Sequence, residues 1–198
     1  MLEPTMLAAF FLAAVTAYFS PGPNNLMLMT SSAKFGLAAT MPHAIGIIFG
    51  FPVMLFVVGL GLGEVFTAYP VLSTIMRYAA AAYFLWMAWT MLGISIGPAS
   101  GSERPMRAYE AALFQWINPK AWATAVSFAA FFVPPGEGRI VNLLVLSIGS
   151  AMLSPMSCAL WMVGGRALIT FLQRTGGERF LGGVLAALML IAVVLFLI

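Results

Sequence analysis

Charged residues are scarce in this chain of 198 residues. Only 8% of them are Asp, Glu, Lys or Arg, whereas a soluble domain carries about a quarter. Hydrophobic residues make up 62% of the chain. So little polar surface cannot keep a folded globule in water. The composition therefore excludes a soluble protein and indicates a protein that is embedded in a lipid bilayer.

Acidic residues are absent from the middle of every long apolar segment. The chain has no Asp, and its six glutamates lie at the ends of these segments or between them: Glu3, Glu64, Glu103, Glu110, Glu137 and Glu178. An intramembrane enzyme needs paired acids, a nucleophile with its base, or metal ligands at depth. With one histidine and one cysteine, only a Ser/Lys pair can be assembled. We therefore expect no enzymatic activity, no metal and no cofactor.

Cysteine pairs and clusters of basic residues are lacking as well. Cys158 stands alone, which excludes an intrachain disulfide and a redox carrier that works with two thiols. The nine Lys and Arg residues are scattered singly along the chain. Without a basic patch we expect no nucleic-acid partner.

Six apolar segments are each long enough to cross a bilayer, which takes about 20 residues. They run over about residues 7–29, 38–62, 75–96, 111–133, 140–163 and 180–198. We therefore predict an all-α polytopic membrane protein with six transmembrane helices, in a single transmembrane domain over residues 1–198. A polar, cytoplasmic loop at about 97–110 links the two halves, 1–97 and 108–198.

Basic residues between these segments predict the orientation. One set of loops carries six of them: Lys34, Arg104, Arg107, Arg166, Arg174 and Arg179. The opposite side carries only Arg77 and Arg139. Because loops rich in Lys and Arg stay in the cytoplasm, we expect both termini on the outer side of the membrane.

The first apolar segment contains a run of helix-breaking and amide residues: Ser20, Pro21, Gly22, Pro23, Asn24 and Asn25. Each proline lacks an N–H and clashes with the carbonyl four residues back, so the carbonyls of Ala17 and Phe19 lose their helical partners. A broken helix is tolerated in hydrocarbon only where it is buried in protein or lines a wet cavity. A kink that serves helix packing is the alternative, but two prolines followed by two asparagines favour a binding site.

Prolines interrupt corresponding positions of the two halves. Pro23 and Pro119 lie about half a chain apart, and so do Pro52 and Pro155, whereas the third segment of each half has no proline. With three segments per half, the second half is inserted upside down. We therefore predict two inverted three-helix repeats, each with a broken first helix, and a transport site near the midplane.

Lys120 is the strongest single candidate for substrate binding. It lies about ten residues into the fourth segment, where a lysine needs an anion, a wet cavity or a route to an interface. Beside Asn118 it can receive a substrate carboxylate; the alternative is that it snorkels to the interface. Asn24, Asn25 and Asn118 can bind the ammonium and carboxylate of a zwitterion, or cap freed carbonyls. Gln115, one turn before Asn118, can line the same cavity.

Two further features allow alternatives. His43 is the only side chain that titrates near neutrality unperturbed, so a proton-coupling role is conceivable, but we interpret it as a hydrated residue at the interface. If transport is proton-coupled, the proton is carried by Glu110, His43 or the substrate. Pairs of glycines allow close helix packing, within the chain or in a homodimer: Gly46 with Gly50, and Gly182 with Gly183.

Two motifs resemble signatures of a known family, the LysE/RhtB amino-acid exporters. Residues 19–26 read Phe-Ser-Pro-Gly-Pro-Asn-Asn-Leu and resemble the family's Thr/Ser-Pro-Gly-Pro-Asn signature. Residues 114–121 read Phe-Gln-Trp-Ile-Asn-Pro-Lys-Ala and resemble its Asn-Pro-Lys-Ala signature. Residues 82–85, Ala-Tyr-Phe-Leu, are similar to a run in the family's third span. The likeness covers nearly the whole chain.

The resemblance implies a multi-pass transporter of the bacterial inner membrane that exports amino acids or small derivatives, driven by the proton-motive force, with both termini periplasmic. The double asparagine resembles the branch that exports cysteine and O-acetylserine. We expect alternating access around a midplane site for a small zwitterionic substrate. The predicted site comprises Pro21, Gly22, Pro23, Asn24, Asn25, Gln115, Asn118, Pro119 and Lys120. A non-transporting membrane scaffold and an exporter of another metabolite are the alternatives.

Overall fold

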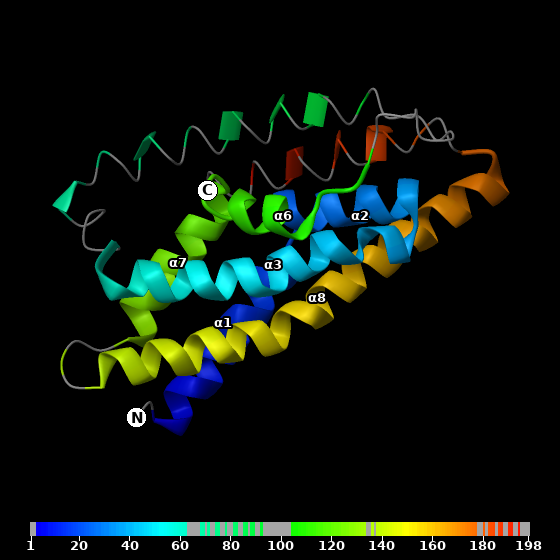
Figure 1. Ribbon diagram of the computed structural model, residues 1–198. Coiled ribbons are helices and arrows are strands. Elements are labelled where there is room, and N and C mark those ends of the chain that lie inside the picture. The colour runs from blue at the N-terminus through cyan, green and yellow to red at the C-terminus, as the bar shows by residue number, and fades with distance from the viewer. Residues whose placement is uncertain are drawn as a thin grey trace.

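A computed structural model describes residues 3–62, 104–133, 136 and 138–177, together with scattered residues between 68 and 92 and between 180 and 194. All regular structure in these residues is helical (Figure 1). Most of the predicted third and sixth spans, including the aromatic residues at 83 and 84, lies outside the described residues. So do Glu64, Arg77, Glu103, Glu137, Glu178 and Arg179.

The first apolar segment folds as two helices with a break between them. α1 covers Pro4–Phe19 and α2 covers Pro23–Phe35, and the chain bends by 50° at the break. Pro23 occupies the first turn of α2, where its missing N–H has no helical partner in any case. The prediction of a broken helix at residues 20–25 is therefore confirmed.

The next helix, α3, covers Leu37–Val57 and passes into a short π-helical turn, η1, at Val58–Leu62. Pro52 lies inside α3 and does not interrupt it. Likewise Pro155 lies inside α8, which runs unbroken over Arg139–Thr175. The predicted interruptions at Pro52 and Pro155 are thus wrong. A single proline removes one hydrogen bond, which a helix supported by its neighbours tolerates.

The second break is a short turn between two helices. α6 covers Ala108–Phe114, a turn follows at residues 115–117, and α7 covers Pro119–Phe132. The Asn118 side chain caps α7 by accepting a hydrogen bond from the Lys120 amide, 3.1 Å away. The predicted fourth span is therefore two helices joined by a turn.

The long α8 also corrects the predicted position of a loop. The sequence predicts Arg166 and Arg174 in the connection after a span that ends near Val163. In the structure both arginines lie on the last turns of α8, which ends at Gly176 in a left-handed conformation. The segment between Val163 and Thr175 contains no proline, so nothing in it stops the helix earlier.

Two apolar clusters hold these helices together. One joins α1, α3, α7 and α8, with Phe10, Phe51 and Leu143 among its buried members. The other joins α2, α3, α6 and α8: Leu28, Ala44, Ile47, Ala111, Cys158 and Met162. Residues of the two breaks line a cavity together with members of both clusters.

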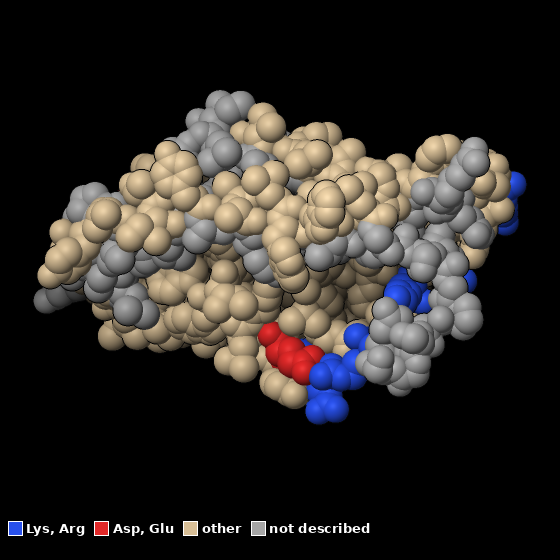
Figure 2. Space-filling model, turned by 90° about the horizontal axis from the view of Figure 1, so that it is seen from above, with Lys and Arg blue, Asp and Glu red and all other residues tan. Residues whose placement is uncertain are grey.

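Two described helices are long and apolar enough to cross a membrane: Leu37–Gly61 and Arg139–Thr175. The bent pair of α1 and α2 makes a third if it is counted as one span. Many large apolar side chains on these helices face outward, such as Leu12, Phe49 and Met152, as expected for surfaces that contact lipid. On the face seen in Figure 2 the charged side chains gather at one end of the molecule.

Candidate functional site

Lys120 joins the two breaks. From the first turn of α7, its ammonium donates hydrogen bonds to the Ser20 carbonyl at 2.9 Å, the Ser20 hydroxyl at 2.8 Å and the Pro21 carbonyl at 3.1 Å. These three acceptors use all three of its protons. We call this arrangement the Lys120 clasp. It places a cation at the C-terminal end of α1, where the helix dipole favours positive charge.

Gly22 makes room for the clasp. Its φ of 177° is extended backbone that any residue adopts, so the requirement here is steric. A Cβ atom at this position would lie 2.7 Å from Cδ and 2.9 Å from Nζ of Lys120. Any side chain at position 22 would therefore push Lys120 away from Ser20 and Pro21.

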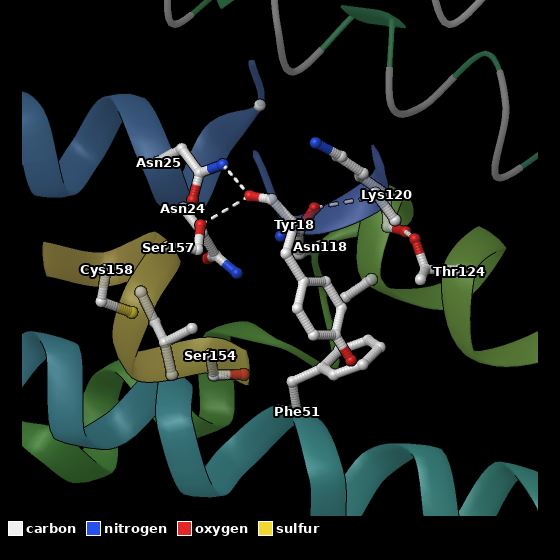
Figure 3. A pocket seen from close by; sticks show the side chains of 14 residues that line it. Tyr18, Asn24, Asn25, Phe51, Asn118, Lys120, Thr124, Ser154, Ser157 and Cys158 are labelled. Carbon is white, nitrogen blue, oxygen red and sulfur yellow. Dashed lines mark hydrogen bonds between the residues drawn. The ribbon is translucent and has the colours of Figure 1, made fainter. Parts of the chain in front are cut away.

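Asn25 and Ser157 complete the cap on α1. The Asn25 amide donates to the Tyr18 carbonyl at 2.7 Å and to the Ser20 carbonyl at 2.9 Å. The Ser157 hydroxyl of α8 also donates to the Tyr18 carbonyl, at 2.7 Å (Figure 3). The break therefore leaves carbonyls that α2, α7 and α8 satisfy together, and moving any one of these helices would remove a hydrogen bond from at least one of them.

A pair of side-chain amides connects the two broken segments a second time. Asn24 donates to the Gln115 carboxamide oxygen at 2.8 Å, and Gln115 also donates to the Ala111 carbonyl at 2.8 Å. Gln115 is fully buried. The pair links the start of α2 to the end of α6.

The clasp borders a small cavity of about 60 Å³. Five of the nine predicted site residues line it: Gly22, Asn24, Asn25, Asn118 and Lys120. The other four lie beside it in the two breaks. Gln115 is the hydrogen-bond partner of Asn24, and Pro21 is an acceptor of the clasp. Pro23 and Pro119 are the first residues of α2 and α7. The structure therefore brings all nine predicted residues into one region.

The sequence analysis missed the opposite wall of this cavity. Tyr18, Phe51, Thr124, Ser154, Ser157 and Cys158 line it together with Ala17, Ile47 and Ala121 (Figure 3). A signal for the α8 residues was present: Ser147, Ser150, Ser154 and Ser157 repeat at intervals of three and four, which places four hydroxyls on one face of an apolar helix. All four are buried, and Ser150 accepts a hydrogen bond from the Tyr18 hydroxyl at 2.6 Å.

His43 is not a hydrated residue at the interface, so that interpretation is wrong. Its side chain is 1% exposed on α3. Among the described residues, neither ring nitrogen has a hydrogen-bond partner. One helical turn further on, Gly46 packs against the start of α6, which explains how the neighbouring helix covers this part of α3.

Glu110 lies in the first turn of α6, at the polar end of the molecule, and forms hydrogen bonds that stabilise the start of this helix. Both of its oxygens pair with the Arg104 guanidinium, at 2.5 and 2.7 Å, and one also accepts the Arg107 amide at 2.8 Å. The hydrogen bond from Arg104, followed by that from Arg107, lowers the pKa of Glu110 to about 2. Glu110 therefore stays ionised at any physiological pH.

This pairing predicts how the stability of the protein depends on pH. A carboxyl whose pKa is lowered on folding stabilises the folded state above its unfolded value, here 4.5, and loses this effect as the pH falls toward 2. We expect wild type to melt at a slightly higher temperature than Glu110→Gln at pH 7 and the difference to shrink below pH 4.5. Melting curves of both proteins in detergent test this, and a difference that grows in acid would contradict it.

Broken helices that meet at a cavity with amide, hydroxyl and ammonium groups in its lining are typical of one class of protein, the membrane transporters. The sequence model of the family described as LysE type translocator matches residues 15–198. The chain belongs to this family, and the resemblance of the two motifs is confirmed.

Curated relatives extend this match over the full length. The chain is 25% identical over 190 residues to "Cysteine/O-acetylserine efflux protein" of Escherichia coli O139:H28 (strain E24377A / ETEC), which covers 96% of each protein. It is 25% identical over 178 residues to proteins of the same name from Escherichia coli (strain K12) and Shigella sonnei (strain Ss046). These matches cover 89% of this chain and 91% of each relative. No solved structure gives a significant match.

Proposed function

We propose that this protein exports amino acids or small amino-acid derivatives across the bacterial inner membrane, by alternating access around the cavity beside the Lys120 clasp. The observation that carries the proposal is the clasp itself, which ties together two broken helices at a cavity lined by amides, hydroxyls and an ammonium. The relatives are named for efflux of cysteine and O-acetylserine, which are small and zwitterionic. A small cavity suits substrates of this size.

The start of α2 provides donors for the substrate carboxylate. Pro23 is the first residue of α2, so the backbone amides of Asn24 and Asn25 lie in the first turn, where no helical acceptor exists. Such amides, together with the positive end of the helix dipole, bind anions. Both residues border the cavity, and Lys120 adds a full positive charge beside them.

The acceptors of the clasp suit the substrate ammonium. Lys120 places an ammonium against the carbonyls of Ser20 and Pro21, so the same acceptors can hold the ammonium of a zwitterion. In this mechanism the substrate carboxylate draws Lys120 away from α1 while the substrate ammonium takes its place. Substrate binding then replaces a contact between the two broken segments, which links binding to the movement of helices.

The two apolar clusters act as the barriers on either side of the cavity. Phe51 and Ala121 belong to one cluster, Ile47 and Cys158 belong to the other, and all four line the cavity. Opening one cluster at a time would expose the cavity to one side of the membrane. The basic end of the molecule then faces the cytoplasm, with both termini periplasmic.

His43 is the side chain we assign to proton coupling. Glu110 is held ionised by Arg104, which removes it as a proton carrier near neutral pH. Protonated His43 needs water or acceptors that no described residue provides at its buried position, so in this proposal its protonation requires the surrounding helices to separate. Among the described residues, the titratable and charged groups on α1, α2, α6, α7 and α8 are Tyr18, Lys34, Tyr109, Glu110, Lys120, Arg139, Cys158, Arg166 and Arg174, and Arg104 and Arg107 lie just before α6.

Replacing His43 with leucine separates this role from a structural one. Each buried, unpaired ring nitrogen costs about 1–3 kcal/mol, so the melting temperature of His43→Leu should equal or exceed that of wild type. Efflux by this variant should lose its dependence on the pH gradient. The measurement is transport in proteoliposomes with and without an imposed gradient. Efflux that still follows the gradient would remove His43 from the coupling mechanism.

The glycines of α3 are not available for a contact between two copies of the chain in a homodimer. Gly46 and Gly50 are occupied within the chain, because added Cβ atoms there would meet α6 at Ala111 and Ala112. Gly183, by contrast, has no atom of the described residues within 4 Å of its Cβ position. We therefore place a possible dimer contact near Gly183, and native mass spectrometry of the intact protein in detergent tests it.

The test of function is the efflux of amino acids from energised cells that overproduce the protein. Mass spectrometry of the medium should show one or a few small amino acids, with cysteine or O-acetylserine among them, accumulating above the level of uninduced cells. A Lys120→Ala variant, present in the membrane at the same level, should not release them. If neither protein releases an amino acid, the export proposal fails for this class of substrate.

A further inference from the structure

A groove at the end of α8 combines two arginines with an apolar wall. It has a volume of about 410 Å³ and lies between the end of α8 and the start of α3, lined by Leu37, Val163, Arg166, Ala167, Thr170, Phe171 and Arg174. This groove is separate from the cavity at the clasp, with which it shares no residue.

The arginines follow one face of the helix. Arg166, Thr170 and Arg174 are spaced by four residues, so their side chains lie on one side of α8, about 12 Å apart from first to last. Both arginines are exposed, and among the described residues neither forms an ion pair. Arg174 lies in the last turn, where the helix dipole favours a cation, but Arg166 lies two turns earlier and gains nothing from it.

The length of α8 places these arginines at the surface of the bilayer. Its 37 residues span about 55 Å at 1.5 Å per residue, against about 30 Å of hydrocarbon. Even a tilt of 40° uses only about 26 residues to cross the hydrocarbon. If α8 enters it near Arg139, the helix leaves it close to Arg166, and the last turns lie among the lipid headgroups.

The apolar wall of the groove is exposed, and contact with another apolar group would stabilise it more than contact with water. Val163 is 55% exposed, Phe171 is 62% exposed and Leu37 is 41% exposed. They lie beside guanidinium groups that favour phosphate. An acyl chain and an anionic headgroup on one molecule match this combination, whereas a soluble phosphate would leave the apolar wall uncovered.

We propose that the groove between the end of α8 and the start of α3 binds one anionic phospholipid, with its phosphate on Arg166 and Arg174 and an acyl chain along Val163, Ala167 and Phe171. The inference does not depend on the transported substrate. It predicts that anionic lipid remains with the purified protein and stabilises it.

Native mass spectrometry and melting curves of the full-length protein in detergent test the proposal. The probes are phosphatidylglycerol, phosphatidylcholine with the same acyl chains, and soluble glycerol 3-phosphate. Phosphatidylglycerol should be retained on the protein and raise its melting temperature, while the other two should do neither. Equal retention of phosphatidylcholine would overturn the assignment, as would stabilisation by glycerol 3-phosphate alone.

Substitutions at the groove test whether the lipid binds there. The double substitution R166Q/R174Q should reduce retention of phosphatidylglycerol at least tenfold, and Arg107→Gln, which removes an exposed arginine just before α6, should leave it unchanged. Ala167→Trp should also abolish retention, because it fills the groove while keeping both charges. The melting temperature of each variant is also measured with phosphatidylcholine, to confirm that the variant is folded. Retention by R166Q/R174Q at the wild-type level would refute the site.

Discussion

Replacing Gly22 with alanine is expected to abolish efflux and to lower the melting temperature of the protein. The added Cβ would lie 2.7 Å from Cδ of Lys120, so the lysine side chain must leave its position. It then loses hydrogen bonds to Ser20 and Pro21. Hydrogen bonds to a charged group contribute about 1.5–3 kcal/mol each. Even one lost bond would lower the melting temperature by roughly 3–12 °C in a protein of this size.

The chain offers a matched control for this substitution. Gly164 is helical, on α8, and no atom in the described part of the chain lies within 4 Å of its Cβ position. Gly164→Ala should be neutral or slightly stabilising, because alanine is favoured over glycine inside a helix. Melting curves in detergent and efflux from cells measure both effects. Normal efflux by Gly22→Ala would show that transport does not need the clasp.

The second large effect is expected for Lys120→Met. Methionine keeps most of the length of the side chain but removes the charge, which leaves the Pro21 carbonyl without the ammonium that it accepts from. In the proposed mechanism the substrate carboxylate also loses its cation. Efflux should fall at least about tenfold, which corresponds to about 1.4 kcal/mol.

The second lysine provides the control for Lys120. Lys34 lies in the last turn of α2, 5.7 Å from the ring of Phe35, and does not border the cavity. Lys34→Met removes the same charge from a position that does not border the cavity, so efflux should stay within about twofold of wild type. A substrate-binding assay on purified protein separates the two roles of Lys120. Unchanged affinity in Lys120→Met, with a lower melting temperature, would make the clasp purely structural.

The sequence predicted both breaks because proline acts locally. Two prolines around Gly22 end a helix together, and at the Asn118–Pro119 pair the asparagine also caps the helix that follows. The family followed from the same residues. Lone prolines gave a wrong prediction, since Pro52 and Pro155 lie in helices that continue through them. Whether a helix tolerates one missing hydrogen bond depends on tertiary packing, which the local sequence does not contain.

The partners of the site residues could not be predicted for a similar reason. Lys120 was expected to bind a substrate, but nothing near it in sequence indicates that its ammonium reaches Ser20 and Pro21, about 100 residues earlier. The role of Ser157 against the Tyr18 carbonyl depends on how α8 packs against α1. The burial of His43 depends on α6, whose close approach at Gly46 the sequence only suggests.

The most direct test of the central claim is transport by purified protein in proteoliposomes, with the amino acid found in the cell assay as substrate. Wild type, the double variant Lys120→Met with Asn25→Ala, and the control Lys34→Met are compared at equal incorporation. The vesicles are loaded with unlabelled substrate, and labelled substrate is added outside. The account predicts uptake of the labelled substrate by vesicles with wild type or the control, and none by vesicles with the double variant. If the double variant transports at the wild-type rate, the site at the two broken helices does not carry the substrate.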